Sequence, residues 1–102
     1  MSYHIFFHHG AELGLQTQVQ KGRLDLNDHS LVFRSSGDIT SISINTIRSV
    51  GMFRLHGLSR VIRLDHDAGS TFLAVTRLMI GQFAFVNFFK TGALFRQIQA
   101  ML

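Results

Sequence analysis

The last twelve residues form the pattern that most restricts the fold of this chain. Residues 91–102 are predicted to form one amphipathic helix, because apolar side chains recur there at three- and four-residue spacing. Its apolar face is expected to contain Leu94, Phe95, Ile98, Met101 and Leu102. Thr91 is the expected N-cap, since its hydroxyl can accept from the amides of the first turn. One apolar-faced helix after a series of strands most economically covers the open end of a β-barrel or sandwich.

The sequence before the helix alternates between apolar and polar residues, as half-buried strands do. Gly22, Leu24 and Leu26 are expected on one face of the first clear strand, opposite Lys21 and Arg23. Turn-forming residues at 27–29, 35–38 and 67–69 separate later strands, and Gly69 is available for a positive φ. Strands are expected at about 17–26, 30–34, 39–44, 47–54, 60–65, 70–77 and 81–89.

Together these elements predict a single mainly β domain over residues 1–102. The expected fold is an antiparallel seven-stranded sandwich or partly open barrel, capped by one C-terminal α-helix. Strands occupy residues 17–89, and residues 1–16 are expected to be irregular, although residues 3–7 could form a short strand. The helix is expected to bury Phe95 and Ile98 against strand residues and to leave the glutamines at 97 and 99 on its polar face. The strand partners expected for it are Leu24, Phe33 and Phe72.

Composition excludes several classes of protein. Hydrophobic residues make up 46% of the chain, including ten Phe, so a packed core is expected rather than disorder. The absence of cysteine excludes disulfides and thiolate sites. The first seven residues lack the basic region of a signal peptide, and the nearly apolar stretch 78–89 is too short to cross a bilayer, so a cytoplasmic protein is expected.

The strand pattern resembles the pleckstrin-homology superfamily, especially its GRAM-like and bacterial members. The resemblance covers roughly residues 17–102. It rests on Gly22 with Leu24, Leu31 with Phe33, Ile42 with Ile44, and Ile47 with Val50, followed by two hairpins and the final helix. It implies a PH-like fold, in which Phe95 fills the place of the Trp that eukaryotic lipid-binding members carry in the last helix. Those members also cluster basic residues around the first two strands, where this chain has Lys21, Arg23 and Arg34.

No pattern for catalysis or for a cofactor is found. A serine nucleophile would need a base and an orienting group, and neither a nucleophile elbow nor a glycine-rich phosphate loop is present. His4, His8, His9 and Glu12 would share one side of a helix and could then bind a metal, but residues 3–7 favour a strand. His66 is expected to be an exposed turn residue. The chain is therefore predicted to be non-enzymatic, with no cofactor and no metal.

The charge is basic, with ten Lys and Arg against six Asp and Glu, but the cations are scattered along the chain. Phe33, Phe72 and Phe95 lie at core spacing, and no nucleic-acid-binding motif is present, which argues against nucleic-acid binding. The favoured function is a binding or scaffolding domain whose partner is a protein, including another copy of the chain. In this hypothesis Tyr3, Phe6 and Phe7 form the interface, either by covering a strand edge or by pairing with a neighbour.

The alternative hypothesis is peripheral binding to an anionic membrane surface. The candidate contacts are Lys21, Arg23 and Arg34 near the first hairpin and Arg54 and Arg60 around a later loop. This hypothesis requires the cations of both regions to converge on one end of the barrel.

Overall fold

The structure, a computed structural model, describes residues 2–10, 20–55, 59–80 and 83–102. Within these residues eight strands precede one α-helix. The strands are β1 (Ser2–His9), β2 (Gln20–Leu26), β3 (Ser30–Ser35), β4 (Asp38–Ser43), β5 (Ile47–Leu55), β6 (Ser59–His66), β7 (Gly69–Ile80) and β8 (Phe83–Val86). A short 3-10 turn, η1 (Ile44–Thr46), joins β4 to β5, and the helix is α1 (Phe88–Met101).

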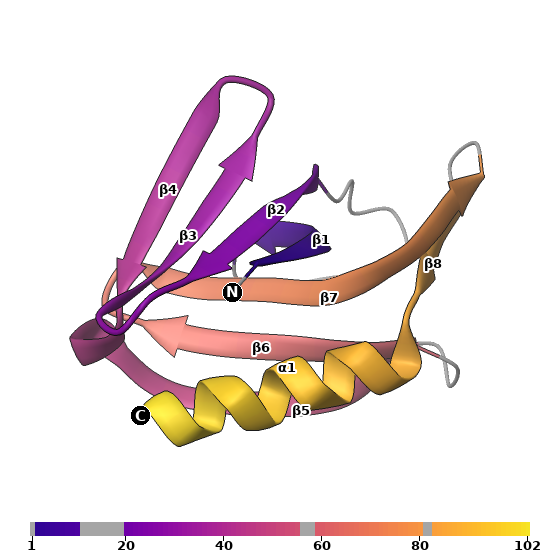
Figure 1. The fold of residues 1–102 in the computed structure, drawn as a ribbon. Coiled ribbons are helices and arrows are strands. Elements are labelled where there is room, and N and C mark those ends of the chain that lie inside the picture. Colours follow the sequence, from indigo (N-terminus) through magenta and orange to yellow (C-terminus); the bar gives the residue numbers. More distant parts are fainter. Residues whose placement is uncertain (1, 11–19, 56–58, 81–82) are drawn as a thin grey trace.

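All the strand pairs are antiparallel, and the strands follow the order β4-β3-β2-β1-β7-β6-β5, with β8 paired to β7. The sheet does not close, so β4 and β5 are its two edges. Figure 1 shows β2, β3 and β4 rising away from β5 and β6, with α1 lying along β5 and β6. The predicted mainly β antiparallel fold with one C-terminal helix is confirmed.

The N-terminal segment is a central strand over residues 2–9, so the strand allowed for residues 3–7 is found and the prediction of an irregular segment is wrong there. β1 pairs with β2 on one side and with β7 on the other. Ile5, Phe6 and Phe7 are all nearly inaccessible to solvent. Ile5 and Phe7 belong to the hydrophobic core, as expected for alternate residues of a strand. Residues 11–15 lie outside the described residues.

The predicted turns at 27–29, 35–38 and 67–69 occur where the sequence placed them. The Asn27 side chain accepts hydrogen bonds from the backbone amides of His29 and Ser30, at 2.9 and 2.8 Å. Gly37 and Gly69 adopt φ values of 80° and 131°, which side chains larger than glycine disfavour. These local features set the register of the β2–β3, β3–β4 and β6–β7 hairpins.

The core lies between the inner face of the bent sheet and α1. Leu94 and Ile98 of α1 are fully buried. They pack with residues from both halves of the sheet, namely Ile5, Phe7, Leu24, Leu31, Phe33, Ile42, Ile62, Leu64, Leu73 and Val75. Phe95 packs against this cluster but is only half-buried. Phe72 is buried outside the cluster, where the Arg63 guanidinium lies 5.7 Å from its ring centre, so its predicted contact with the helix is not found.

The helix begins earlier than predicted, and Thr91 is not its N-cap. Asn87 caps the helix, and its side-chain oxygen accepts from the Lys90 amide at 3.0 Å. Thr91 is fully buried one turn later, and its hydroxyl accepts from the Val75 amide at 3.0 Å. The Asn87 amide donates in turn to the Val75 carbonyl at 2.8 Å. The start of α1 is therefore fastened to β7 through both backbone groups of Val75.

A second polar contact joins α1 to the sheet. The Tyr3 hydroxyl donates to the Gln97 side-chain oxygen at 2.7 Å. Gln97 is half-buried, whereas Gln99 is exposed as predicted. The prediction that both glutamines occupy the polar face is therefore wrong for Gln97, because a partner from β1 lies beside it.

Candidate functional site

The three predicted cations of the first hairpin lie close together. Arg23 and Arg34 are direct partners in the β2–β3 pair, and Lys21 lies two residues before Arg23 on the same face of β2. Asp25 accepts from Arg34 Nε at 2.8 Å and lies 3.7 Å from Arg23 Nε. This carboxylate offsets part of the positive charge, and all of these ion pairs are at least one-third exposed.

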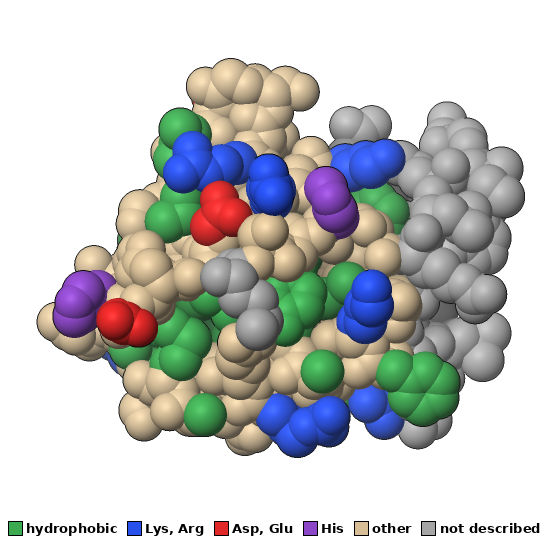
Figure 2. All heavy atoms as spheres, in the orientation of Figure 1, with side chains coloured by type: hydrophobic (Ala, Val, Ile, Leu, Met, Phe, Trp, Pro, Cys, Tyr) green, Lys and Arg blue, Asp and Glu red, His purple; other side chains and the backbone are tan. Residues whose placement is uncertain are grey.

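The other two predicted cations lie elsewhere in the fold. Arg54 of β5 is paired in register with Arg60 of β6, and the Arg54 side chain lies outside the described part of the structure. An Arg60 guanidinium nitrogen lies 2.6 Å from the position that a Cβ on Gly92 of α1 would occupy. The sheet order places β1 and β7 between the two groups of cations. Figure 2 likewise shows the Lys and Arg side chains of this face as separate groups over the upper strands and along the lower edge.

The three predicted interface residues are not presented at the surface. Phe6 and Phe7 have 4% and 3% of their surface exposed, and Tyr3 is half-buried beside Gln97. β1 pairs with β2 over Ser2–Phe7 and with β7 over Ile5–His9, so Phe6 and Phe7 have a strand on each side. Of the two arrangements expected for this segment, the structure has the one in which it covers strand edges of its own sheet, and Phe6 and Phe7 are too buried to contact a neighbour.

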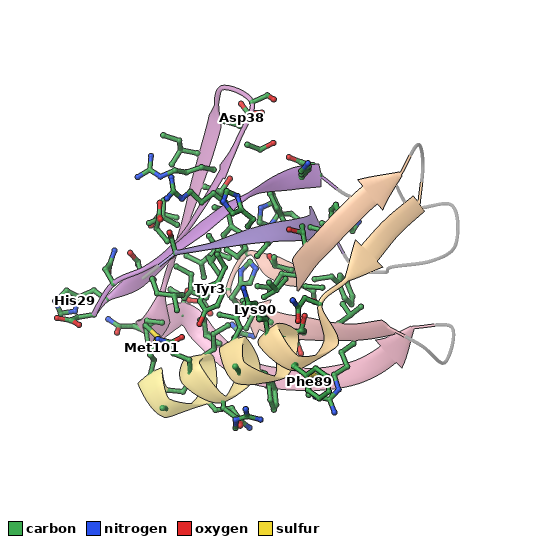
Figure 3. All side chains as sticks on the ribbon, turned by 45° about the vertical axis from the view of Figure 1, so that its right-hand side comes forward. Tyr3, His29, Asp38, Phe89, Lys90 and Met101 are labelled. Carbon is green, nitrogen blue, oxygen red and sulfur yellow. The ribbon has the colours of Figure 1, made fainter. Side chains whose placement is uncertain are left out.

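An exposed aromatic residue instead lies at the start of α1. Phe89 is 82% exposed and lies at the start of α1 (Figure 3), and the next residue, Lys90, is also exposed. Phe89, Gly92 and Arg96 share one face of the helix at three- and four-residue spacing. The guanidinium of Arg60 lies against that face at Gly92. This basic helix face was not predicted as a unit, because it combines α1 with the start of β6.

The edge strand β4 carries few of the features that protect sheet edges. It pairs with β3 on one side, and no described strand pairs with its other side. It has no proline, no lysine and no register shift, and Asp38, at the tip of its hairpin in Figure 3, is its one charged residue. Ile39 is 64% exposed.

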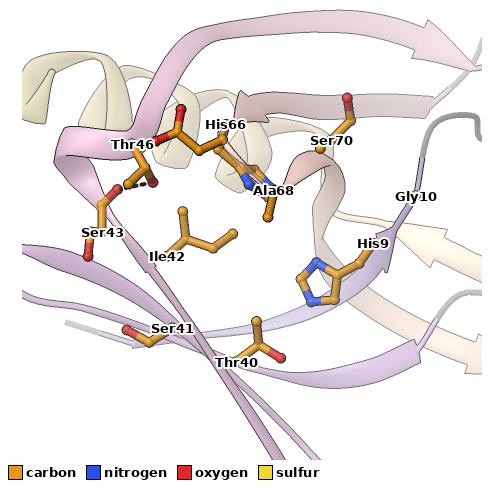
Figure 4. Close-up of a pocket in the computed structure, with 12 residues that line it drawn as sticks. His9, Gly10, Thr40, Ser41, Ile42, Ser43, Thr46, His66, Ala68 and Ser70 are labelled. Carbon is orange, nitrogen blue, oxygen red and sulfur yellow. Dashed lines mark hydrogen bonds between the residues drawn. The ribbon is translucent and has the colours of Figure 1, made fainter.

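A pocket of about 770 Å³ lies between β4 and the β6–β7 hairpin. This size is typical of small-molecule sites. The pocket is lined by His9, Gly10, Thr40, Ser41, Ile42, Ser43, Thr46, His66, Asp67, Ala68, Gly69 and Ser70. Figure 4 shows the His9 ring pointing into this space from the end of β1, with Ile42 opposite it. No lysine or arginine is found among the described residues of the lining.

Two histidines of the pocket meet at one buried hydroxyl. His9 Nδ1 lies 2.8 Å from Thr71 Oγ1, and His66 Nε2 lies 2.9 Å from the same oxygen. Thr71 is fully buried. The β1–β7 register, which pairs His9 with Thr71, brings the first histidine to this position, and the tight β6–β7 hairpin brings the second. His66 is therefore half-buried and bonded, and the prediction of an exposed turn residue is wrong.

The other ring nitrogen of His9 has no such partner. Nε2 is buried, and no hydrogen bond to it is found from the residues that the structure describes. The ring packs at 5.2 Å from the Phe7 ring and at 5.3 Å from the Phe33 ring. Burial, followed by the nearby His66 and His8, lowers the pKa of His9. The site therefore holds an imidazole whose ordinary state is neutral and whose buried Nε2 receives no hydrogen bond from the described residues.

The rim of the pocket is organised by two carboxylates. Asp65 accepts from the hydroxyls of Ser70 and Ser49 and from Arg63, and these hydrogen bonds lower its pKa to about 2. Asp67 accepts from Arg48 at 3.0 Å. Both carboxylates therefore already accept hydrogen bonds from the protein, Asp65 from β5, β6 and β7 and Asp67 from β5.

The histidines of β1 do not form the metal group that a helix would have created. Alternation along the strand places His4 and His8 on the face opposite His9. Glu12 lies outside the described residues. Within the described part of the chain, no group of three or more His, Cys, Asp or Glu side chains is placed to hold a metal ion. The two histidines that do meet direct one nitrogen each at Thr71.

Comparison with known proteins adds a fold relationship. No protein-family model matches the chain, and a search of curated proteins finds no match. A crystal structure of the C-terminal domain of an unknown protein from Leishmania infantum is similar, with a TM-score of 0.69 and 15% sequence identity. The match covers 99% of this chain and 80% of that one. At this identity the similarity concerns the fold alone.

Proposed function

We propose that this domain is a non-enzymatic binding module that self-associates through the free edge of β4. The observation that carries the proposal is this six-residue edge, which has an exposed Ile39 and no protecting lysine, proline or bulge. An unpaired strand edge offers a row of backbone donors and acceptors that a second strand can pair with. The β3–β4 hairpin stands out from the rest of the molecule, which leaves room for that approach (Figure 1).

The composition of β4 favours a second copy of the same strand as the occupant. In an antiparallel pair centred on Ser41, Ile39 faces Ser43 of the other copy and Thr40 faces Ile42. Every one of these side chains is neutral, so no like charges oppose each other. The two Asp38 carboxylates fall at opposite ends of the pair. A two-fold axis of this kind gives a closed dimer.

The experiment is sedimentation velocity from low to several hundred micromolar protein. The wild type is expected to shift from monomer to dimer with concentration. Ser41→Lys, which places two ammonium groups opposite each other at the axis, is expected to remain monomeric. Gln99→Lys adds the same charge on an exposed part of α1 and is expected to behave as the wild type. A wild type that stays monomeric throughout, or a Ser41→Lys variant that dimerises equally, would contradict the proposal.

Cross-linking tests the geometry directly, because the chain contains no cysteine. Residues directly opposite in an antiparallel pair have Cβ atoms about 4.5–5.5 Å apart, close to disulfide distance. Ser41→Cys is therefore expected to form a covalent dimer under mild oxidation. Gln99→Cys is the matched control and is expected to cross-link only slowly by random collision. Equal cross-linking of the two variants would rule out the Ser41 axis.

A second candidate function, binding to an anionic membrane surface, is supported by the basic face of α1. Phe89 is exposed between Lys90 and the guanidiniums of Arg60 and Arg96 near Gly92. An aromatic side chain flanked by cations suits insertion between anionic headgroups. No helix within the described residues is long and apolar enough to cross a bilayer.

Vesicle co-sedimentation at low salt tests this second candidate. Vesicles of phosphatidylcholine with phosphatidylserine are expected to bind the wild type, and salt is expected to weaken the binding. Phe89→Ser is expected to bind less, whereas Leu102→Ser, at the exposed C-terminal residue, is the control. Absence of binding at low salt would contradict this function. If Phe89→Ser binds the vesicles as well as the wild type, Phe89 does not contribute to membrane binding.

A further inference from the structure

We propose that the pocket between β4 and the β6–β7 hairpin binds a small organic molecule that carries a carboxylate, with His9 Nε2 as the group that recognises it. Nε2 is a buried polar atom to which none of the described residues is hydrogen-bonded. A buried polar atom without a partner costs free energy, which a ligand oxygen at hydrogen-bond distance would recover. The His9 ring points into the pocket in Figure 4.

The hydroxyl of Thr71 allows His9 to meet such a ligand in either protonation state. A hydroxyl can accept from a ring N–H or donate to a bare ring nitrogen. Nδ1 of His9 can therefore accept from Thr71 when the ring is neutral, or donate to it when the ring is cationic. In both cases Nε2 carries the proton that the proposal assigns to the ligand. His66, bonded to the same oxygen, completes the chain of hydrogen bonds.

The lining indicates the chemical class of the ligand. Ile42 and Ala68 provide apolar surface, and Thr40, which shares the face of β4 with Ile42, adds a hydroxyl beside it. A multiply charged phosphate would require lysine or arginine, and no such residue is among the described residues of the lining. A metal ion is disfavoured, because His9 Nδ1 and His66 Nε2 already share Thr71. A monocarboxylate with an apolar body matches one imidazole, the Thr40 hydroxyl and an apolar wall.

Recognition of an anion by His9 makes binding depend on pH. The groups around the ring are His8 on β1, His66 on β6, Asp67 in the β6–β7 turn and Asp38 on β4. Burial, followed by His66 and His8, lowers the pKa of His9, whereas a bound carboxylate stabilises the imidazolium. Binding therefore takes up a proton, and affinity is expected to rise as pH falls, by up to about tenfold per pH unit.

The probe is phenylacetate, measured by NMR of the ring nitrogens and side chains of the whole chain. Phenylacetate is expected to shift the signals of His9, His66 and Thr71, with affinity that rises between about pH 7.5 and 5.5. Phenylacetamide, which has the same shape without the charge, is expected to bind at least tenfold more weakly. Failure of phenylacetate to shift His9 at roughly 10 mM would overturn the proposal. Equal affinity for the amide would overturn the assignment of a carboxylate.

Variants identify the recognising atom. His9→Gln is expected to weaken phenylacetate binding at least tenfold and to remove its pH dependence, whereas His29→Gln, at an exposed turn, leaves both unchanged. If His9→Gln does not fold, direct titration of His9 in the wild type decides the question. The proposal requires the pKa of His9 to rise when phenylacetate is bound. An unchanged His9 titration would overturn it.

Discussion

Thr91→Val removes one hydrogen-bond acceptor while keeping the size and branching of the side chain. Thr91 is fully buried, and its hydroxyl accepts from the Val75 amide at 3.0 Å. Valine leaves that amide without its acceptor in a site that is closed to water, at a cost of about 1–3 kcal/mol. For a domain of this size each kcal/mol lowers the Tm by roughly 4–8 °C, so a decrease of about 5–20 °C is expected.

Thr91→Ser is the matched control, because it keeps the acceptor and removes one buried methyl group. That loss costs about 1 kcal/mol. Chemical denaturation and hydrogen exchange of the Val75 amide together decide the result: the valine variant should be the less stable, and its Val75 amide should exchange faster. If only the burial of apolar surface mattered, the serine variant would be the less stable, because it loses a buried methyl group that valine keeps. A valine variant as stable as the wild type would therefore refute the role of this hydrogen bond.

Four further predictions follow from single contacts. Asn87→Ala should lower the free energy of unfolding by about 0.5–2 kcal/mol, measured by denaturation, because it removes the helix cap. Leu94→Ala should cost about 2–5 kcal/mol in the same assay, since this side chain is fully buried. The pKa of Asp65 falls from 3.8 unfolded to about 2 folded, so its stabilisation is present above pH 4 and is lost towards pH 2. In the Asp65→Asn variant, the free energy of unfolding should therefore change less between about pH 4 and pH 2 than in the wild type. Gly22→Ala should destabilise strongly, because its Cβ would overlap the backbone carbonyl of Arg34 in β3. Gly51→Ala meets nothing within 4 Å and should be tolerated.

The elements that local chemistry decides could be predicted from the sequence. The alternation of Leu24 and Leu26 with charged residues identified β2, and the Asn27 and Gly69 turns fixed two hairpins. In each case the residues that determine the structure lie within a few positions of one another. The amphipathic pattern of the helix likewise identified Leu94 and Ile98, both of which are buried.

The central strand β1 could not be predicted with the same clarity. Tyr3, Ile5 and Phe7 face the core, but Phe6 on the opposite face is also buried. A strand covered on both faces loses the apolar–polar alternation that marks a half-buried one. Without that alternation, the sequence does not show whether the aromatic residues of this segment cover an edge of their own sheet or pair with a neighbour.

The candidate site depended on contacts between residues far apart in the sequence. Threonine is a residue type that often caps helices, so the sequence favours that role for Thr91. The structure shows instead that the Thr91 hydroxyl accepts from the Val75 amide of β7. His9 and His66 are brought together at Thr71 by two strand registers. A shift of one residue in either register would send a histidine to the other face, and periodicity alone does not determine register to that accuracy.

The open edge and the pocket have one structural origin, which is the turn η1. The Ile44 amide donates to the His29 carbonyl at 2.8 Å, and the Thr46 carbonyl accepts from the Asp67 amide at 3.2 Å. The first hydrogen bond joins η1, the corner between β4 and β5, to the β2–β3 turn, and the second joins it to the β6–β7 turn. From this corner β4 continues to its free edge, and the pocket lies between β4 and the β6–β7 hairpin. A strand that pairs with β4 would therefore border the pocket, so dimerisation and carboxylate binding are expected to alter each other's affinity reciprocally.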